Sequence, residues 1–284
     1  MKELIVIGQG PAGISAALYA VRGGAPVTVV AKDGGALERA GLIQNYYGFD
    51  GGVQAKELIA AGVRQAKALG VRFVQAEVYG IAFGEGGYDA ETSAGTLHGV
   101  ALVLAVGTAR NVPKIENIQK FEGAGVSYCA VCDAFFFRGK KVGVIGSGAY
   151  AAAEYAHLKG VTENVTVLSD GQPPAFDGIP CDARKIAALE GGNALEEVVF
   201  ADGARERYDG LFVACGSAGA FELAKKLGLQ TDGGKIVTDE KRATDAPGVF
   251  AAGDCVAGMQ QIAKAVYDGM IAGTEALRYL KALG

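Results

Sequence analysis

The feature that most limits the fold of this chain is a glycine-rich turn between an apolar strand and a helix, and it occurs twice. Residues 3–31, "ELIVIGQGPAGISAALYAVRGGAPVTVVA", predict a strand, a turn at residues 8–13, a helix and a second strand. In such a dinucleotide fingerprint Gly8 permits the tight turn, Gly10 lets the backbone approach a pyrophosphate, and Gly13 allows close helix packing. The helix N-terminus then faces the phosphates, so this segment predicts a dinucleotide site.

The same pattern returns at residues 140–170. The residues at its three fingerprint positions are Gly146, Gly148 and Ala151. A second repeated feature is a buried strand that runs into a glycine turn, at residues 101–109 and again at residues 210–218. Two matches in the expected setting predict a duplication. We therefore expect an α/β protein with two Rossmann-like, three-layer β/β/α dinucleotide-binding domains, the second inserted into the first.

The end of the chain is expected to belong with the first domain. Residues 246–256, "APGVFAAGDCV", predict one more strand ending in Gly253 and Asp254, followed by a helix. If this strand closes the first domain, that domain comprises residues 1–111 and 240–284, and residues 112–239 form the insertion. Two chain crossings would connect the domains, which favours relative motion between them.

Charge and hydropathy exclude several classes of partner. With a net charge of −4 and no polybasic run, the chain lacks the basic surface that nucleic acids or anionic membranes require. The uncharged run at residues 4–21 is interrupted by glycines and a proline, so a strand, turn and helix explain it better than a membrane span. The N-terminal residues do not have the regions of an export signal. We expect a cytoplasmic protein whose partners are small molecules or other proteins.

Two of the five cysteines have an informative spacing. Cys129 and Cys132 are three residues apart in "CAVCD", which is typical of a redox dithiol or of half a zinc site. Zinc needs about four ligands. The sequence has no second cysteine pair, so we expect a dithiol and no metal. Cys181, Cys215 and Cys255 are expected to be packing residues.

Together these motifs resemble the low-molecular-weight flavin thioredoxin reductases, which have an FAD domain and an inserted pyridine-nucleotide domain. The resemblance covers essentially the whole chain and rests on "GQGPAG", "GGAL", "QNYYGF", "CAVCDAFFFRGKKVGVIGSG" and "GVFAAGDC". It implies FAD as the cofactor. The FAD-binding positions that it implies are Gly8, Gly10, Pro11, Ala12, Gly13, Lys32, Asp33, Gly35, Ala36, Leu37, Asn45, Gly107, Gly253, Asp254, Gln261 and Ile262.

The same resemblance gives the dithiol a role. A reduced flavin can pass two electrons to a disulfide, and a dithiol can pass them on through a mixed disulfide. By this resemblance Cys132 faces the flavin and starts exchange with thioredoxin or a thioredoxin-like protein, and Cys129 resolves the mixed disulfide. Asp133 is then the acid that protonates the leaving thiolate. The "AFFF" run at residues 134–137 is expected to be a core strand, and a homodimer is expected because family members usually form one.

The inserted domain departs from the pattern of the pyridine-nucleotide-dependent members. Where these carry arginines for the 2′-phosphate of NADPH, this chain has Ser169, Asp170 and Gly171, and an aspartate repels a phosphate. Tyr150 lies at a fingerprint position where the family usually has a small polar residue, so its ring could fill the space of the pyrophosphate. The interval from Ser169 to Gly210 is also short for the helix and strands that complete such a domain.

These departures favour the branch of the family that lacks a working pyridine-nucleotide site and takes electrons from ferredoxin. We therefore expect an FAD-dependent thioredoxin-disulfide reductase with reduced ferredoxin as its electron donor. NADH stays open as a donor, because an acid after the second strand can bind the ribose hydroxyl groups of NAD. The same motifs would also suit a dithiol oxidase that uses oxygen or a noncatalytic flavin-binding sensor.

Overall fold

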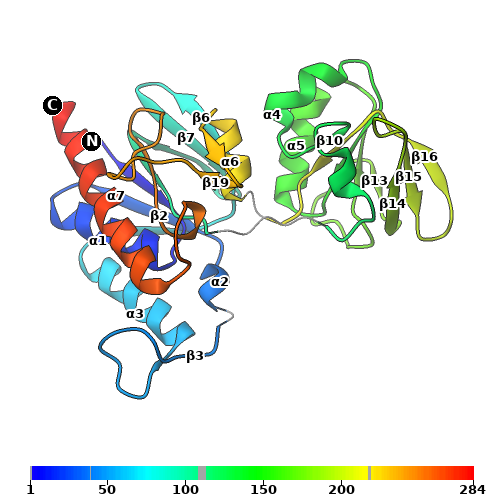
Figure 1. Cartoon of the computed structure of the whole chain (residues 1–284). Helices are drawn as coiled ribbons and strands as arrows, with labels where there is room; N and C mark the ends of the chain where they lie inside the picture. The colour runs from blue at the N-terminus through cyan, green and yellow to red at the C-terminus, as the bar shows by residue number, and fades with distance from the viewer. Residues whose placement is uncertain (1, 39, 108–112, 217–218) are drawn as a thin grey trace. The chain divides into compact units, whose positions relative to one another are not determined.

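The computed structural model describes residues 2–38, 40–107, 113–216 and 219–284. The chain divides into two compact units, here called unit 1 (Met1–Arg110 with Gly219–Gly284) and unit 2 (Asn111–Ala218) (Figure 1). The first domain boundary expected from the sequence, between residues 111 and 112, lies outside the described residues.

The second domain boundary differs from the one expected. Residues 219–239, expected in the insertion, belong to unit 1. The reason is that α6 (Ala220–Lys226) packs against β6 (Val78–Gly84) and β19 (Lys235–Ile236), with Leu223 fully buried. The insertion therefore ends before α6.

The core of unit 1 is a five-stranded parallel sheet with the order β20-β9-β1-β2-β5. Its strands are β1 (Leu4–Ile7), β2 (Val27–Ala31), β5 (Arg72–Gln75), β9 (Ala101–Leu104) and β20 (Val249–Ala251). In the register of the central strand, Leu4 lies opposite Val27 on one side and Ala101 on the other. The strand expected near the end of the chain is β20, which belongs to this sheet and pairs with β9.

Helices cover one face of this sheet and a small antiparallel sheet covers the other (Figure 1). The helices are α1 (Pro11–Arg22), α3 (Ala55–Ala68) and α7 (Ile262–Ala282), and the second sheet consists of β6, β7 (Gly87–Thr92) and β8 (Gly95–Gly99). Successive strand residues point to opposite faces. Leu4 and Val6 accordingly pack in the cluster that includes α1 and α7, whereas Ile5 contacts β8 near Gly99. The expected β/β/α layering is confirmed.

Small residues bring α1 and α7 close together. A Cβ on Gly269 would lie 2.1 Å from the carbonyl oxygen of Ala12, and a Cβ on Gly273 would lie 2.2 Å from that of Ala16. This contact fixes the last helix against the helix that follows the first glycine turn. The remaining elements of unit 1 are α2 (Gly35–Glu38), β3 (Leu42–Ile43), β4 (Val53–Gln54), β18 (Thr231–Asp232) and η3 (Gly253–Cys255).

Unit 2 repeats this architecture. Its parallel sheet has the order β10-β17-β11-β12-β13, one face of which carries α5 (Ala149–Lys159) and the other an antiparallel sheet, β14-β15-β16. The strands are β10 (Val126–Ser127), β11 (Val142–Ile145), β12 (Val165–Leu168), β13 (Cys181–Asp182), β14 (Ile186–Glu190), β15 (Glu197–Phe200), β16 (Arg205–Arg207) and β17 (Gly210–Val213). Short helices η1 (Ile118–Phe121), α4 (Ala130–Asp133) and η2 (Ala134–Phe137) complete the unit.

The two glycine turns make the same close contact. A Cβ on Gly8 would lie 2.3 Å from the carbonyl oxygen of Ala105, and a Cβ on Gly146 would lie 2.2 Å from that of Ala214. Ala105 follows β9 and Ala214 follows β17, so both repeated sequence features meet in the same way in each unit. The predicted duplication is confirmed.

Candidate functional site

The glycine turn of unit 1 has the shape of a dinucleotide phosphate site. Gly8 has a φ of 110°, and Gly13 packs so closely that a Cβ would lie 1.9 Å from the Gly8 carbonyl oxygen. Gly10 is the N-cap of α1, and a Cβ there would meet no protein atom within 4 Å. Pro11 begins the helix, where its missing N–H costs nothing. The first turn of α1 therefore presents backbone amides to open space, as a pyrophosphate requires.

The segment after β2 holds the next group of predicted cofactor contacts. Lys32 and Asp33 are exposed, and Asp33 Oδ1 accepts a hydrogen bond from Gly35 N at 2.8 Å. Gly35 begins α2 with a φ of 68°, and the same short helix contains the exposed Ala36 and the half-buried Leu37. The Asp33 carboxylate thus holds the turn into α2.

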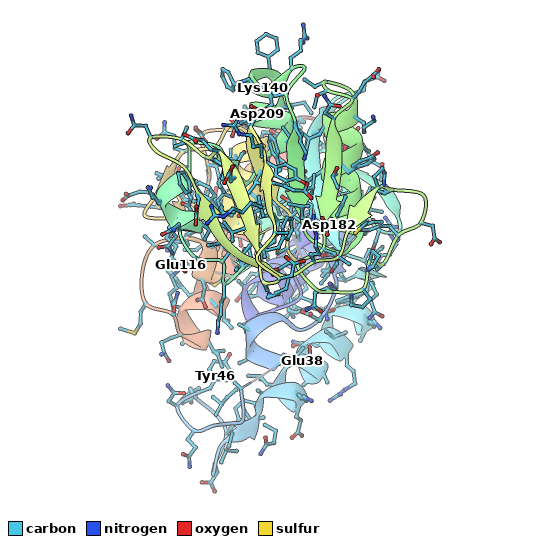
Figure 2. The ribbon with its side chains drawn as sticks, turned by 90° about the vertical axis from the view of Figure 1, so that its right-hand side faces the viewer. Glu38, Tyr46, Glu116, Lys140, Asp182 and Asp209 are labelled. Carbon is cyan, nitrogen blue, oxygen red and sulfur yellow. A yellow bond between two sulfur atoms is a disulfide. The ribbon has the colours of Figure 1, made fainter. Side chains whose placement is uncertain are left out.

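Asn45 joins two segments that are far apart in the sequence. Its Nδ2 donates to Gln261 Oε1 at 3.0 Å, and Gln261 is the N-cap of α7. Leu37, Tyr46 and Ile262 pack against one small apolar cluster in this part of unit 1, where Figure 2 labels Tyr46. The structure therefore brings together four of the residues predicted to contact the cofactor, namely Leu37, Asn45, Gln261 and Ile262.

A buried ion cluster holds the predicted Gly253 and Asp254 segment. Asp268 of α7 is fully buried; its Oδ2 accepts from Gly253 N at 3.1 Å and lies 2.8 Å from Lys264 Nζ, and its Oδ1 accepts from Arg242 Nε at 2.9 Å. Lys264 Nζ also donates to the Gly253 carbonyl oxygen at 2.8 Å. A buried carboxylate needs such partners. Sequence reasoning missed this cluster, and its only sequence indication was the i,i+4 spacing of Lys264 and Asp268.

The described residues of unit 1 fit a dinucleotide cofactor. Gly107 follows β9 with a φ of 68°, and, as at Gly10, a Cβ there would meet no protein atom within 4 Å. Gly253 also has a positive φ, of 83°, and its Cβ would collide with Ala12. The predicted contacts follow the carboxyl ends of β1, β2, β9 and β20, which is the edge where ligands bind such sheets.

The two cysteines of the "CAVCD" segment form a disulfide in unit 2. The Cα atoms of Cys129 and Cys132 are 5.3 Å apart. Cys129 is fully buried and is the N-cap of α4, where its Sγ accepts from Cys132 N at 3.2 Å. Cys132 is exposed. The two cysteines therefore differ in exposure to solvent, and Cys132 is the one that a partner protein can reach.

Ser127 links the predicted acid to the disulfide segment. Its Oγ donates to Asp133 Oδ2 at 2.6 Å and accepts from Cys129 N at 3.1 Å. Asp133 N in turn donates to the Cys129 carbonyl oxygen at 3.1 Å. Asp133 thus lies in the same turn as both cysteines, and Ser127 is a residue of this site that sequence reasoning missed.

The aromatic run after the disulfide is not a core strand, and that expectation was wrong. Residues 134–137 form the short helix η2, in which Phe135 and Phe136 are 69% and 68% exposed. The Arg138 guanidinium lies 5.1 Å from the centre of the Phe135 ring. The exposed side chains of Phe135, Phe136 and Arg138 therefore lie within six residues of the exposed Cys132 in the sequence.

The three remaining cysteines fall into two kinds. Burial raises the pKa of the Cys215 and Cys255 thiols to about 11, so both are uncharged packing residues at neutral pH, as expected. Cys181 on β13 is exposed, so the expectation that it packs was wrong. Among the residues that the structure describes, no group of three or more His, Cys, Asp or Glu side chains could hold a metal ion.

The Tyr150 side chain at the second glycine turn packs into the interior of unit 2. Its side chain is 2% exposed, and its hydroxyl group donates to the Tyr128 carbonyl oxygen at 3.4 Å. The ring is therefore buried inside unit 2.

A loop contacts the second glycine turn at Ser147. The loop at residues 169–180 connects the parallel strands β12 and β13 without a helix, and Ala175 N donates to the Ser147 carbonyl oxygen at 2.7 Å. Parallel strands usually need a helical crossover. Residues 169–209 contain four strands and no helix, which agrees with the expected shortening of this domain.

Asp170 is committed to contacts within unit 2. It has a φ of 52°, its Oδ1 accepts from Ile186 N at 2.8 Å, and its Oδ2 lies 2.8 Å from Lys185 Nζ. A nucleotide ribose would have to compete with these two partners for the carboxylate. Lys185, the nearby cation, is likewise paired.

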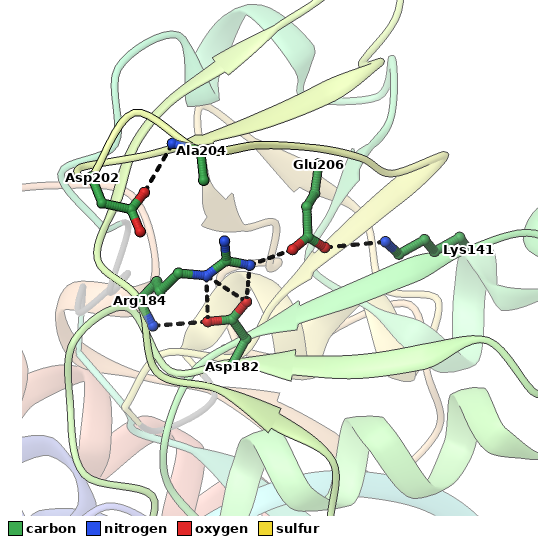
Figure 3. Close-up of polar contacts among 6 residues, drawn as sticks. All are labelled: Lys141, Asp182, Arg184, Asp202, Ala204 and Glu206. Atoms are coloured by element: carbon green, nitrogen blue, oxygen red, sulfur yellow. Dashed lines mark hydrogen bonds and ion pairs between the residues drawn. The ribbon is translucent and has the colours of Figure 1, made fainter.

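The neighbouring basic residues are also paired with carboxylates (Figure 3). The Arg184 guanidinium donates to Asp182 and to Glu206, and Glu206 Oε2 lies 3.2 Å from Lys141 Nζ. Hydrogen bonds from Arg184 lower the pKa of both the Asp182 and the Glu206 carboxyl groups. Asp182 ends β13, and Figure 2 shows it at the opposite end of the sheet from Asp209, which precedes β17.

Two units of dinucleotide-binding architecture, one of which carries a disulfide, define a two-domain flavin-disulfide oxidoreductase. Residues 2–269 match the family described as pyridine nucleotide-disulphide oxidoreductase. The chain belongs to this family and, within it, to the low-molecular-weight thioredoxin reductases, whose members bind FAD. No helix in the described parts of the chain is long and apolar enough to cross a membrane.

Similar proteins cover nearly the whole chain. A thioredoxin reductase of Listeria monocytogenes is 29% identical over 99% of this chain and 94% of its own length. The crystal structure of the atypical thioredoxin reductase TRi from Desulfovibrio vulgaris Hildenborough is 39% identical over 99% of both chains, with a TM-score of 0.94. A ferredoxin-flavin thioredoxin reductase from Clostridium acetobutylicum is 26% identical over 99% of this chain and all of its own, with a TM-score of 0.73.

Proposed function

We propose that this protein is an FAD-dependent reductase of the disulfide in thioredoxin or a thioredoxin-like protein. The observation that carries the proposal is the bonded pair of Cys129 and Cys132 in a chain whose other unit has the cradle for FAD. Bound FAD would supply a carrier that accepts electrons singly or as a pair and delivers two of them to a disulfide. The thioredoxin reductases among the similar proteins support the substrate class. A cytoplasmic location and a homodimer remain predictions from the sequence.

The different exposure of the two cysteines supports their roles. In the reduced enzyme the Cys132 thiolate attacks the substrate disulfide, which forms a mixed disulfide and releases one substrate sulfur as a thiolate. Asp133, held by Ser127 in the same turn, supplies the proton to that thiolate. The Cys129 thiol then gives up its proton and attacks the Cys132 sulfur, which re-forms the enzyme disulfide. The second substrate sulfur leaves as a thiolate and takes up that proton, so the substrate is released as a dithiol. Two electrons and two protons pass to the substrate.

Reduced ferredoxin, rather than NADPH or NADH, is the electron donor in this proposal. Asp170 stands where a phosphate-binding arginine is expected, and a carboxylate repels a phosphate. Ala175, in a loop that has no helix, contacts the Ser147 carbonyl oxygen in the turn that would carry the pyrophosphate. The ferredoxin-flavin thioredoxin reductase among the similar structures supports this choice.

The test of the donor is anaerobic mixing of the oxidised flavoprotein with NADPH, NADH or reduced ferredoxin while the flavin absorbance is followed. Ferredoxin should bleach the flavin rapidly and both nicotinamides slowly. Rapid bleaching by NADPH or NADH would contradict this proposal and indicate a thioredoxin reductase that depends on that nucleotide. A second assay measures thioredoxin reduction with ferredoxin as donor. Turnover with small dithiols and oxygen, but none with thioredoxin, would instead indicate a dithiol oxidase.

A further inference from the structure

Helix α5 contacts the main chain on both sides of Cys129. The Tyr150 hydroxyl group donates to the Tyr128 carbonyl oxygen at 3.4 Å, and Ala130 N donates to Glu154 Oε2 at 2.7 Å. Tyr128 directly precedes Cys129 and Ala130 directly follows it. Tyr150 and Glu154 are four residues apart and thus lie on one face of α5. Two side chains of one helix therefore bracket the buried cysteine.

These contacts lie in the interior of unit 2. Glu154 is 1% exposed and Tyr150 is 2% exposed, while Cys129 and Ala130 are fully buried. In such surroundings a hydrogen bond to a carboxylate is stronger than in water, and removal of the acceptor leaves a buried N–H without compensation. The bond from Ala130 to Glu154 should thus be the stronger of the two, because it is shorter and involves a carboxylate.

The hydrogen bonds of Tyr150 and Glu154 on either side of Cys129 matter most when the disulfide is reduced to the dithiol. In the oxidised protein the bond between the sulfur atoms itself holds Cys129 and Cys132 together. In the dithiol that bond is gone, and the position of Cys129 depends on the main chain that carries it. Hydrogen bonds directly before and after Cys129 hold that main chain against α5.

We propose that Tyr150 and Glu154 are positioning residues of the redox pair, which keep Cys129 buried in the dithiol so that Cys132 alone meets a partner disulfide. This inference rests on the proposed function for its purpose, although the positioning concerns only cysteines of this chain. It also gives a role to the tyrosine at the second glycine turn. The Tyr150 hydroxyl group contacts the Tyr128 carbonyl oxygen, which the shorter side chain of a serine or threonine could not reach.

The test measures how fast each cysteine of the fully reduced protein is alkylated by iodoacetamide, with the modified peptides quantified by mass spectrometry. In the parent protein Cys132 should react well before Cys129. Glu154→Ala should raise the rate at Cys129 relative to Cys132 by about tenfold, and Tyr150→Phe should raise it by about threefold. Glu154→Gln keeps an acceptor oxygen for Ala130 N and should restore most of the protection.

Two matched variants control for general destabilisation. Tyr155→Phe changes the neighbouring tyrosine of α5, and Glu163→Ala removes an exposed glutamate that follows the helix. Neither should change the ratio of the two rates. If Glu154→Ala does not fold, Tyr150→Phe and Glu154→Gln still report the ratio.

The inference is overturned if Glu154→Ala or Tyr150→Phe lowers the melting temperature but leaves the alkylation ratio of the parent protein. That result would show that Tyr150 and Glu154 contribute to the stability of unit 2 but do not position Cys129. The ratio requires no thioredoxin, ferredoxin or turnover, so a failure of the proposed function would appear in the separate turnover assay and not here.

Discussion

Ala175 donates its backbone N–H to the carbonyl oxygen of Ser147 across 2.7 Å. Ser147 belongs to the second glycine turn, whereas Ala175 belongs to the loop that replaces the helix between β12 and β13. The first glycine turn is open beside Gly10. The second turn is open beside Gly148 by the same measure, so the duplicated turns share their backbone geometry and differ in the loop contact at Ser147.

Matched glycine substitutions should separate the two turns. Gly10 and Gly148 each cap a helix, each has a negative φ, and an added Cβ would meet no protein atom within 4 Å at either site. Gly10→Ala and Gly148→Ala should therefore both fold with the parent melting temperature. Gly10→Ala should weaken FAD retention by about tenfold or more, because the methyl group would displace a phosphate from its amide donors. Flavin absorbance per mole of purified protein measures this effect.

Gly148→Ala is the control for that experiment. It should retain full flavin and the parent rate of ferredoxin-driven thioredoxin reduction, because the proposed reaction does not use the second turn. A large loss of ferredoxin-driven turnover in fully flavin-loaded Gly148→Ala would contradict the expectation that the reaction does not use the second turn.

Asp170 is expected to stabilise unit 2. Asp170→Ala removes the acceptor for Ile186 N and the partner of Lys185, and it places an alanine at a φ of 52°. An unsatisfied buried N–H together with backbone strain should lower the free energy of unfolding by about 1–3 kcal/mol. Asp170→Asn keeps an acceptor oxygen and tolerates this backbone conformation, so its loss should be smaller. Urea unfolding of both variants measures the difference, and equal losses would contradict the role given to the side-chain acceptor.

The two folds could be predicted from the sequence because their determinants are local. Gly8 and Gly146 both need a positive φ and both lie against a carbonyl oxygen from the neighbouring strand, so glycine is required wherever this turn occurs. The spacing of Cys129 and Cys132 is equally local, and it identified a pair that the structure joins as a disulfide.

The parts that could not be predicted depend on contacts between distant segments. Position 150 in the fingerprint does not reveal which way a large ring turns, and the answer depends on the segment around Cys129 that packs against α5. Asp268 is recognisable as part of the site only when Arg242 and Gly253 are seen beside it. Cys181 was expected to pack, but β13 is an edge strand of its sheet and leaves it exposed.

Stability should decline in alkaline solution because of two buried thiols. Burial raises the pKa of Cys215 and of Cys255 from 9.0 to about 11, so the folded state holds both protons more tightly than the unfolded state does. Their stabilising contribution is complete below pH 9 and is lost as the pH rises to about 11, by about 1–3 kcal/mol for each thiol. Urea unfolding at intervals from pH 8 to pH 11 measures the decline. The double variant Cys215→Ser with Cys255→Ser should decline less over this range, and identical slopes would contradict the assignment.

A trapped mixed disulfide should identify the cysteine that attacks the substrate. Cys132 is exposed and Cys129 is fully buried, so a thioredoxin disulfide can approach the first sulfur atom and not the second. In Cys129→Ser the attacking thiol remains but the resolving thiol is missing, so the adduct with thioredoxin should persist. Cys132→Ser should form little adduct, because the remaining thiol lies beneath the protein surface. Both variants should lose catalytic disulfide reduction, since a complete cycle needs an attacking and a resolving thiol. Mixing each reduced variant with oxidised thioredoxin and separating the products on a non-reducing gel measures the adduct. An adduct formed mainly by Cys132→Ser would reverse the roles assigned to the two cysteines.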